Sequence, residues 1–138
     1  MTSFEYNIND SKYPLIIFNH QTGIFEIKGN SIMVNAYRVY EELLKWIDNY
    51  IKKPNKETIL NVNLYALNTP TSFYLLEIFR KLISIKKVFP NNRVIINWFS
   101  NDEDMHETGE IYKSILTSNY DNLDVEFNII NVYEKEEL

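Results

Sequence analysis

The sequence predicts an α/β fold in which helices cover mainly one face of a β-sheet. Short segments alternate apolar and polar residues, as strands do, and longer segments repeat apolar residues every three or four positions, as helices do. On the alternating segments the second face includes asparagines. Helices on both sides of a sheet require near-continuous apolar strands, so one face is expected to be partly open. The asparagines are Asn61, Asn63, Asn97 and Asn128.

The sheet is expected to begin with a hairpin. Residues 15–18 and 24–28 are short apolar or alternating runs, and residues 19–23, which end in Gly23, are typical of a turn between them. His20 lies in this turn. A catalytic histidine needs a positioned partner, and no motif supplies one, so His20 is expected to be an exposed turn residue.

The first long helix is expected over residues 35–52. Its apolar residues recur at helical spacing and form one stripe, and Pro54 marks its end. The residues of the stripe are Tyr37, Tyr40, Leu44, Ile47 and Ile51.

Further strands and helices alternate along the rest of the chain. Strands are expected over 58–65, 94–99 and 125–132, and helices over 70–88 and 102–116. The helix over 70–88 is apolar around most of its circumference, so it should be the most buried helix. A length of 138 residues fits one domain, expected over 1–138.

Composition excludes several classes of protein. The chain has no cysteine, which rules out disulfides, thiolate nucleophiles and cysteine-bound zinc and fits a cytoplasmic protein. The net charge is −5 and the basic residues are scattered, whereas a nucleic-acid binder normally has a basic face. No apolar stretch is long enough to span a bilayer. We therefore expect neither a nucleic-acid nor a membrane partner.

No motif predicts catalysis. The three glycines cannot form a glycine-rich phosphate loop or a nucleophile elbow where they stand. We therefore expect a protein that is not an enzyme and that has no cofactor and no metal. A small enzyme stays an alternative, because a catalytic triad is defined by geometry rather than by sequence order.

An acidic cluster opens the helix expected over 102–116. His106 and Glu110 are one helical turn apart, a spacing that metal ligands use. Acidic residues are also favoured in the first turn of any helix, and the cluster matches neither an EF-hand loop nor a zinc-protease helix. We favour the structural interpretation over the metal site. The cluster comprises Asp102, Glu103, Asp104, His106, Glu107 and Glu110.

The junction between the strand over 58–65 and the helix after it carries three hydroxyls, on Thr69, Thr71 and Ser72. Thr69 suits the N-cap and Pro70 the first helical position. A phosphate here would meet free backbone N–H groups and the positive end of the helix dipole. Both interpretations hold together, because a hydroxyl can cap a helix until it is modified.

Three stretches form a pattern that covers nearly the whole chain. They are residues 22–31 with 35–40 and Trp46; residues 64–69; and Asn97-Trp98 followed by 102–105 and Gly109-Glu110. In order and spacing they resemble the SiaC family of bacterial regulatory phosphoproteins. That family has a fold similar to the STAS domains of anti-sigma factor antagonists. The resemblance implies a STAS-like mixed β-sheet.

The resemblance also implies a partner switch. In SiaC-like proteins a dedicated serine/threonine kinase with a histidine-kinase-like ATPase fold phosphorylates a threonine before a helix, and a PP2C-type phosphatase reverses this. The unphosphorylated form binds and activates a diguanylate cyclase, which raises cyclic di-GMP and favours aggregation or biofilm. By position the acceptor is Thr69. Because Pro70 follows where the family usually has small hydroxyl residues, Thr71 and Ser72 stay as alternatives.

Residues around this threonine are the expected partner contacts: Asn68, Pro70, Phe73 and Tyr74. For Phe73 and Tyr74 core packing is the alternative, because aromatic residues are commonly buried. The alternative function is a constitutive protein-binding or scaffold domain in which Thr69 is only a helix cap.

Overall fold

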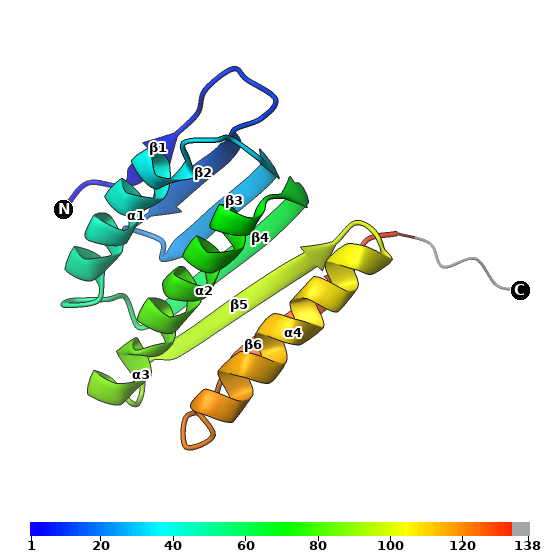
Figure 1. Cartoon of the computed structure of the whole chain (residues 1–138). Helices are drawn as coiled ribbons and strands as arrows, with labels where there is room; N and C mark the ends of the chain where they lie inside the picture. The colour runs from blue at the N-terminus through cyan, green and yellow to red at the C-terminus, as the bar shows by residue number, and fades with distance from the viewer. Residues whose placement is uncertain (134–138) are drawn as a thin grey trace, which may run out of the picture.

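The computed structural model describes residues 1–133, which form one six-stranded sheet and four helices (Figure 1). In chain order these are β1 (Phe4–Tyr6), β2 (Pro14–Asn19), β3 (Ile24–Ser31), α1 (Ala36–Tyr50), β4 (Glu57–Leu67), α2 (Thr69–Ile83), α3 (Ile85–Val88), β5 (Arg93–Ser100), α4 (Glu103–Asn119) and β6 (Glu126–Asn131). The strands lie side by side in sequence order. The pairs β1–β2 and β2–β3 are antiparallel and the other three pairs are parallel, so the predicted mixed sheet is confirmed.

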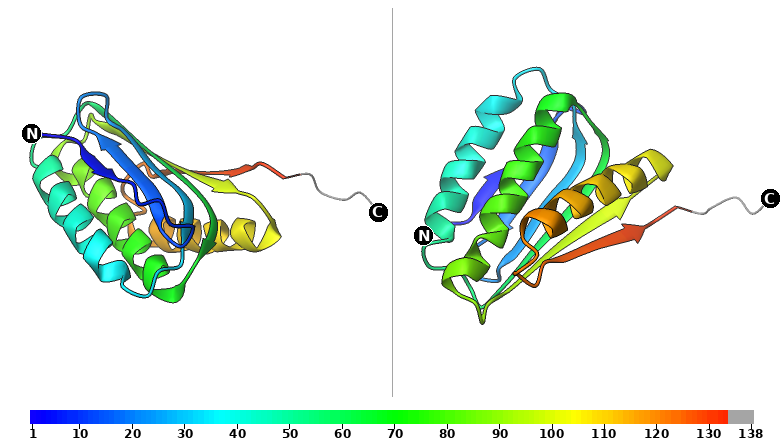
Figure 2. Two further views of the ribbon diagram at one scale, coloured as in Figure 1. Left: turned by 90° about the horizontal axis from the view of Figure 1, so that it is seen from above. Right: turned by 60° about the horizontal axis from the view of Figure 1, so that its bottom comes forward.

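The helices lie on one face of the sheet, as predicted (Figure 2). Strand residues that point toward them are buried, including Leu60, Val62 and Trp98, and they join the inner sides of the helices in a continuous hydrophobic core. Within residues 1–133 no helix is both long enough and apolar enough to cross a bilayer.

The opposite face of the sheet carries the predicted asparagines. Asn61, Asn97 and Asn128 are neighbours across β4, β5 and β6. The side chain of Asn128 donates to Asn97 at 3.1 Å, and that of Asn97 donates to Asn61 at 3.0 Å. This ladder satisfies amide groups that would otherwise need water or a covering layer, which is why this face tolerates polar residues.

Helix α1 buries a different stripe from the predicted one. Tyr40, Leu44 and Ile47 are buried as expected, but Tyr37 is 53% exposed and Ile51 falls after the helix. The other buried positions are Ala36, Val39, Leu43 and Tyr50. Both stripes have helical spacing, and contact with the sheet decides which one is buried.

The helix predicted over 70–88 is divided in two. Helix α2 ends at Ile83, and α3 is a separate turn of four residues. The expectation that it is the most buried helix is wrong, since α1 buries seven of its fifteen residues and α2 buries six of fifteen. The outward-facing side of α2, which includes the exposed Phe73, accounts for this difference.

Helix α4 packs closely on β5 at Gly109. A Cβ atom at position 109 would lie 2.5 Å from Cδ1 of Trp98, so a larger residue there would force the helix from the sheet. The indole N–H of Trp98 donates to the carbonyl of Met105 at 2.8 Å. These contacts fix the start of α4 beside the end of β5.

A candidate phosphorylation site at the start of helix α2

Helix α2 begins where β4 ends, and its N-cap is Asn68. The backbone of Asn68 is extended, and its Oδ1 accepts the N–H of Thr71 at 3.1 Å. Thr69 and Pro70 are therefore the first and second helical residues. The prediction that Thr69 is the N-cap and Pro70 the first helical residue is wrong by one position, because asparagine caps at least as well as threonine.

Asn68 also joins the helix start to the end of β3 and the segment after it. Its Nδ2 donates to the carbonyl of Met33 at 3.0 Å, and its backbone N–H donates to the carbonyl of Ser31 at 3.1 Å. The capping bond, and a hydrogen bond that Oδ1 accepts from Oγ1 of Thr71 at 2.8 Å, also hold this residue. The backbone that leads into Thr69 is therefore held in place by Asn68.

Thr71 is buried beneath this cap. Its side chain is 0% exposed, its Oγ1 lies 2.7 Å from Oγ of Ser31, and it has Oδ1 of Asn68 at 2.8 Å and the carbonyl of Ser31 at 2.9 Å as acceptors. As folded, this hydroxyl is out of reach of a kinase.

A chain of buried hydroxyls continues from Thr71 to helix α1. The hydroxyl of Tyr40 lies 2.8 Å from Oγ of Ser31, and burial raises the pKa of Tyr40 to about 12, so it stays protonated. In one consistent order Tyr40 donates to Ser31, Ser31 to Thr71, and Thr71 to Asn68. No sequence pattern predicts this network, because no local spacing connects residues that lie 40 positions apart.

Thr69 is exposed at the first helical position. Backbone N–H groups in the first turn of a helix have no partner within the helix, and α2 has no acidic residue in that turn. Ser72 is half-buried, and its hydroxyl donates to the carbonyl of Thr69 at 2.7 Å. Thr69 and Pro70 are thus the exposed residues of the junction.

Phe73 and Tyr74 point to different sides of α2. The ring of Tyr74 stacks on Tyr40, with centroids 5.3 Å apart, and its hydroxyl donates to Glu41 of α1 at 3.1 Å. Phe73 is 66% exposed, so the core-packing alternative is wrong for Phe73, and Tyr74 packs on the edge of the core. Phe73 lies one turn after Thr69 on the same side of the helix.

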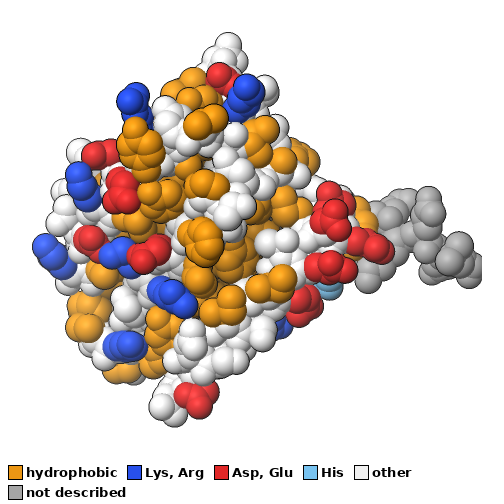
Figure 3. All heavy atoms as spheres, in the orientation of Figure 1, with side chains coloured by type: hydrophobic (Ala, Val, Ile, Leu, Met, Phe, Trp, Pro, Cys, Tyr) orange, Lys and Arg blue, Asp and Glu red, His pale blue; other side chains and the backbone are white. Residues whose placement is uncertain are grey.

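An apolar groove lies between α2 and α4, beside Phe73. Its volume is about 290 Å³, and its walls include Phe73 and Leu76 from α2 and Ile111 and Ile115 from α4. Figure 3 shows apolar side chains gathered along the middle of the helix-covered face and acidic side chains gathered at its right. The groove was not predicted from the sequence, in which the apolar Ile111 beside Glu110 was a local signal of it.

The acidic cluster at the start of α4 lies where the helix dipole favours it. Asp102 is the N-cap, with its Oδ1 accepting the N–H of Met105 at 2.8 Å, and Glu103 and Asp104 lie in the first turn. His106 contacts Asn131 at 2.8 Å and Glu110 at 3.4 Å. In the part of the chain that the structure describes, no three His, Asp or Glu side chains form a candidate metal site.

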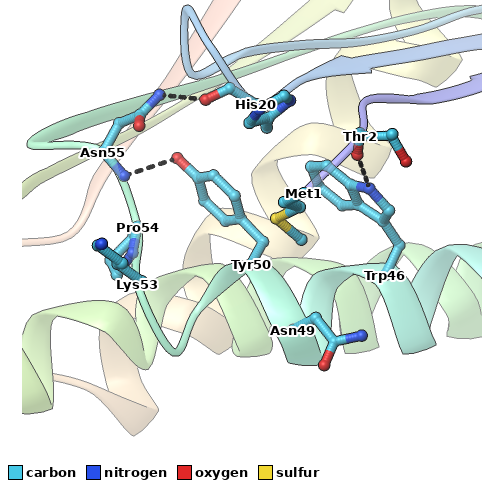
Figure 4. Close-up of a pocket in the computed structure, with 9 residues that line it drawn as sticks. All are labelled: Met1, Thr2, His20, Trp46, Asn49, Tyr50, Lys53, Pro54 and Asn55. Atoms are coloured by element: carbon cyan, nitrogen blue, oxygen red, sulfur yellow. Dashed lines mark hydrogen bonds between the residues drawn. The ribbon is translucent and has the colours of Figure 1, made fainter.

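A second cavity, of about 700 Å³, lies at the other end of the strands, where β2 ends and β4 begins (Figure 4). Met1, His20, Trp46 and Tyr50 are among its lining residues. His20 does lie in a turn, but it is half-buried, and its Nδ1 lies 3.3 Å from Oγ of Ser3. The expectation of an exposed His20 is therefore wrong, because the segment before β1 covers the turn.

Comparison with known proteins identifies the family of this chain. Residues 8–131 match the model of the SiaC family regulatory phosphoproteins. A crystal structure of apo-SiaC from Pseudomonas aeruginosa is similar with a TM-score of 0.78 at 18% identity, over 94% of this chain and 99% of that one. SiaC from the same organism, in a crystal structure with diguanylate cyclase SiaD, gives a TM-score of 0.74 at 18% identity, over 89% and 95% of the two chains.

Structures this distant in sequence establish the fold, and a comparison with curated proteins found no match. The family model covers most of the chain and carries the assignment. This chain therefore belongs to the SiaC family of regulatory phosphoproteins.

Proposed function

We propose that this protein is a partner switch in which reversible phosphorylation of Thr69 controls the binding of a diguanylate cyclase. The observation that carries the proposal is the start of α2, where an exposed threonine occupies a helix N-terminus without acidic residues. A family member has been crystallised with a diguanylate cyclase, which supports this class of partner. The output would be the level of cyclic di-GMP, and through it biofilm or aggregation.

The choice of Thr69 over the alternative acceptors rests on access. Thr71 is fully buried and its hydroxyl participates in the chain from Tyr40 to Asn68. Phosphate on Thr71 would require that network to open. Ser72 is half-buried, with its hydroxyl bonded to a backbone carbonyl. Thr69 can accept phosphate with little disturbance of the fold.

Phosphate on Thr69 would change recognition more than it changes stability. It adds about −1.5 to −2 charges, which the positive end of the helix dipole favours. It also places a strongly hydrated group one turn from the exposed ring of Phe73. A partner that covers Phe73 would have to remove water from that phosphate, at high cost.

The switch acts by binding rather than by catalysis in this proposal. A serine/threonine kinase would add the phosphate and a PP2C-type phosphatase would remove it. Asn68, Pro70, Phe73 and Tyr74 would contact the partner around Thr69. Enzymes that use ATP and GTP as substrates would place the switch in the cytoplasm.

The rival is a constitutive binding domain in which Thr69 serves only as a helix cap. The capping hydrogen bond comes from Asn68, so the cap does not require a hydroxyl at position 69.

Phosphopeptide mass spectrometry tests the acceptor. The protein would be incubated with ATP and a serine/threonine kinase of histidine-kinase-like fold from the same organism, beside Thr69→Ala and Ser72→Ala as matched controls. We expect phosphate on Thr69 in wild type and Ser72→Ala and none in Thr69→Ala. An unmodified Thr69 with an active kinase would overturn the proposal.

Calorimetry with a purified diguanylate cyclase from the same organism tests the switch. The unmodified protein should bind, and the phosphorylated protein or Thr69→Glu should bind at least about tenfold more weakly, a loss of about 1.4 kcal/mol. Equal affinity of the two forms would favour a constitutive binding domain instead.

A further inference from the structure

We infer that the free edge of strand β6 pairs with the same strand of a second copy of this chain, antiparallel about a two-fold axis, with Asn128 opposite Asn128. The two sheets would then join into one continuous sheet. The inference does not depend on the proposed phosphorylation of Thr69, because it concerns a different surface of the molecule and a different partner.

The outer edge of β6 offers unpaired backbone groups. Strand β6 is the last strand of the sheet and has a neighbour on one side only within residues 1–133 (Figure 2). Just after the strand, the N–H of Val132 donates inward to the carbonyl of Ser100 at 2.9 Å. Because a strand directs the backbone groups of successive residues to alternate sides, Phe127, Ile129 and Asn131 direct theirs outward. Such a row of free groups is a template for another strand.

The two edges of the sheet differ in how well they are protected. Strand β1, at the other edge, has three residues, whereas β6 has six and contains neither proline nor lysine. The one charged residue of β6, Glu126, is held by Arg93, whose Nε and Nη2 each donate to the carboxylate at 2.8 Å. Sheets that keep an edge unpaired usually shorten it, charge it or place proline in it. The edge of β6 has none of these protections, so it is suited to pairing.

The asparagine ladder of the open face indicates that the partner is a second copy. Asn128 donates from its Nδ2 to Oδ1 of Asn97 at 3.1 Å, but within residues 1–133 no group donates to its own Oδ1. A side-chain amide carries two N–H donors and a carbonyl acceptor, so two copies of Asn128 that face each other can each donate to the other. A two-fold axis brings a residue to its own copy in this way. The ladder would then run from Asn61 of one chain to Asn61 of the other.

This pairing register also matches apolar residues on the other side of the strand. With Asn128 opposite itself, Phe127 lies opposite Ile129 of the second copy, and the two exchange backbone hydrogen bonds. Pairs of an aromatic and a β-branched residue stabilise neighbouring strands. A register centred on Ile129 would instead place Asn128 opposite Ile130 and leave its amide without a partner. The ladder therefore selects the register centred on Asn128.

Analytical ultracentrifugation of the full chain tests the association. Wild type should show a concentration-dependent equilibrium between monomer and dimer. Asn128→Lys places two like charges opposite each other at the axis and should raise the dissociation constant of the dimer at least about tenfold. Asn9→Lys is the matched control, because it makes the same change at an exposed asparagine between β1 and β2, and it should associate as wild type does. Circular dichroism checks that both variants fold.

Cysteine cross-linking tests the register. The chain has no cysteine, so a single introduced cysteine reports on a single contact. Asn128→Cys should form a disulfide-linked dimer under mild oxidation by air, because Cα atoms about 4.5 Å apart lie within the range that a disulfide spans. Ile130→Cys is the control on the same face of the strand. In this register its two copies lie four residues apart along the strands, about 13 Å, which is too far for a disulfide.

Three outcomes would overturn the inference. A wild type that stays monomeric at high protein concentration would mean that the edge of β6 is not used by a second copy and is left to a strand of another protein. Equal weakening by Asn9→Lys and Asn128→Lys would show that added charge, and not contact at the edge, controls association. Faster cross-linking of Ile130→Cys than of Asn128→Cys would show that the strands do not meet in the register centred on Asn128.

Discussion

Helices α2 and α4 begin with the same kind of cap but carry different charges in their first turns. Each follows a parallel strand at the same edge of the sheet (Figure 1). Each has an Asn or Asp N-cap whose Oδ1 accepts the N–H of the third helical residue, Asn68 to Thr71 at 3.1 Å and Asp102 to Met105 at 2.8 Å. The two helices therefore begin with the same capping geometry.

The two helix starts differ in the charge of their first turn. Helix α4 carries Glu103 and Asp104 in its first turn, whereas α2 carries Thr69 and Pro70 there and no acidic residue. The positive end of the α4 dipole is thus already neutralised, and that of α2 is not. A phosphate on Thr69 would give α2 the charge that α4 has permanently.

The largest expected effect concerns the third helical residue of each helix. Thr71→Val keeps the volume but removes the hydroxyl that meets Ser31 and Asn68, and buried polar groups left without partners cost about 1–3 kcal/mol of unfolding free energy. Met105→Leu, at the equivalent position of α4, should cost less than about 1.5 kcal/mol. Urea denaturation of both variants measures the contrast.

Thr71→Ser serves as the control for this comparison, because it retains the hydroxyl. It should preserve more stability than Thr71→Val does. Equal losses for the two variants would mean that the methyl group, and not the hydroxyl chain, holds the start of α2.

The next effect compares the two caps. Asp102→Ala should cost about 1 kcal/mol, as N-cap removal usually does. Asn68→Ala should cost more, up to about 2 kcal/mol, because it also removes the bond from Nδ2 to the carbonyl of Met33. Thermal and urea unfolding would rank the two, and a larger loss for Asp102→Ala would contradict the role assigned to Asn68.

The smallest effect tests the missing charge directly. Thr69→Glu supplies a carboxylate to the first turn of α2 and should raise stability by about 0.3–1 kcal/mol at low salt, whereas Asp104→Asn should lower it by a similar amount. Both changes should shrink as salt is added. Melting temperatures across a salt series measure this, with Thr69→Gln as the neutral control.

A destabilised Thr69→Glu that does not respond to salt would show that the helix start cannot take an anion. That result would also weaken the case for phosphate at this position. The binding and stability measurements on this variant therefore inform one another.

Five of the six strands, the three long helices and the one-sided sheet could be predicted from local pattern, because alternation and helical spacing report which face of each element is apolar. Strand β1 was not predicted, because three residues are too few to show an alternation, and neither was the division of the helix over 70–88 into α2 and α3. The asparagines of the open face were predicted in the same way, and the structure joins three of them across β4, β5 and β6. The position of the cap was missed by one residue, since Asn68 and Thr69 are both good N-caps and only the bond to Met33 favours Asn68.

The sequence by itself determined the fold class, the family resemblance and the segment in which a phosphate would be placed, because these depend on residues close together in the chain. Tertiary structure decided which threonine is buried and which is exposed, since Ser31 and Tyr40 reach Thr71 but not Thr69. It also decided that Phe73 and Ile111 form one groove. Contacts between distant segments depend on how helices pack on the sheet, and no local spacing records that packing.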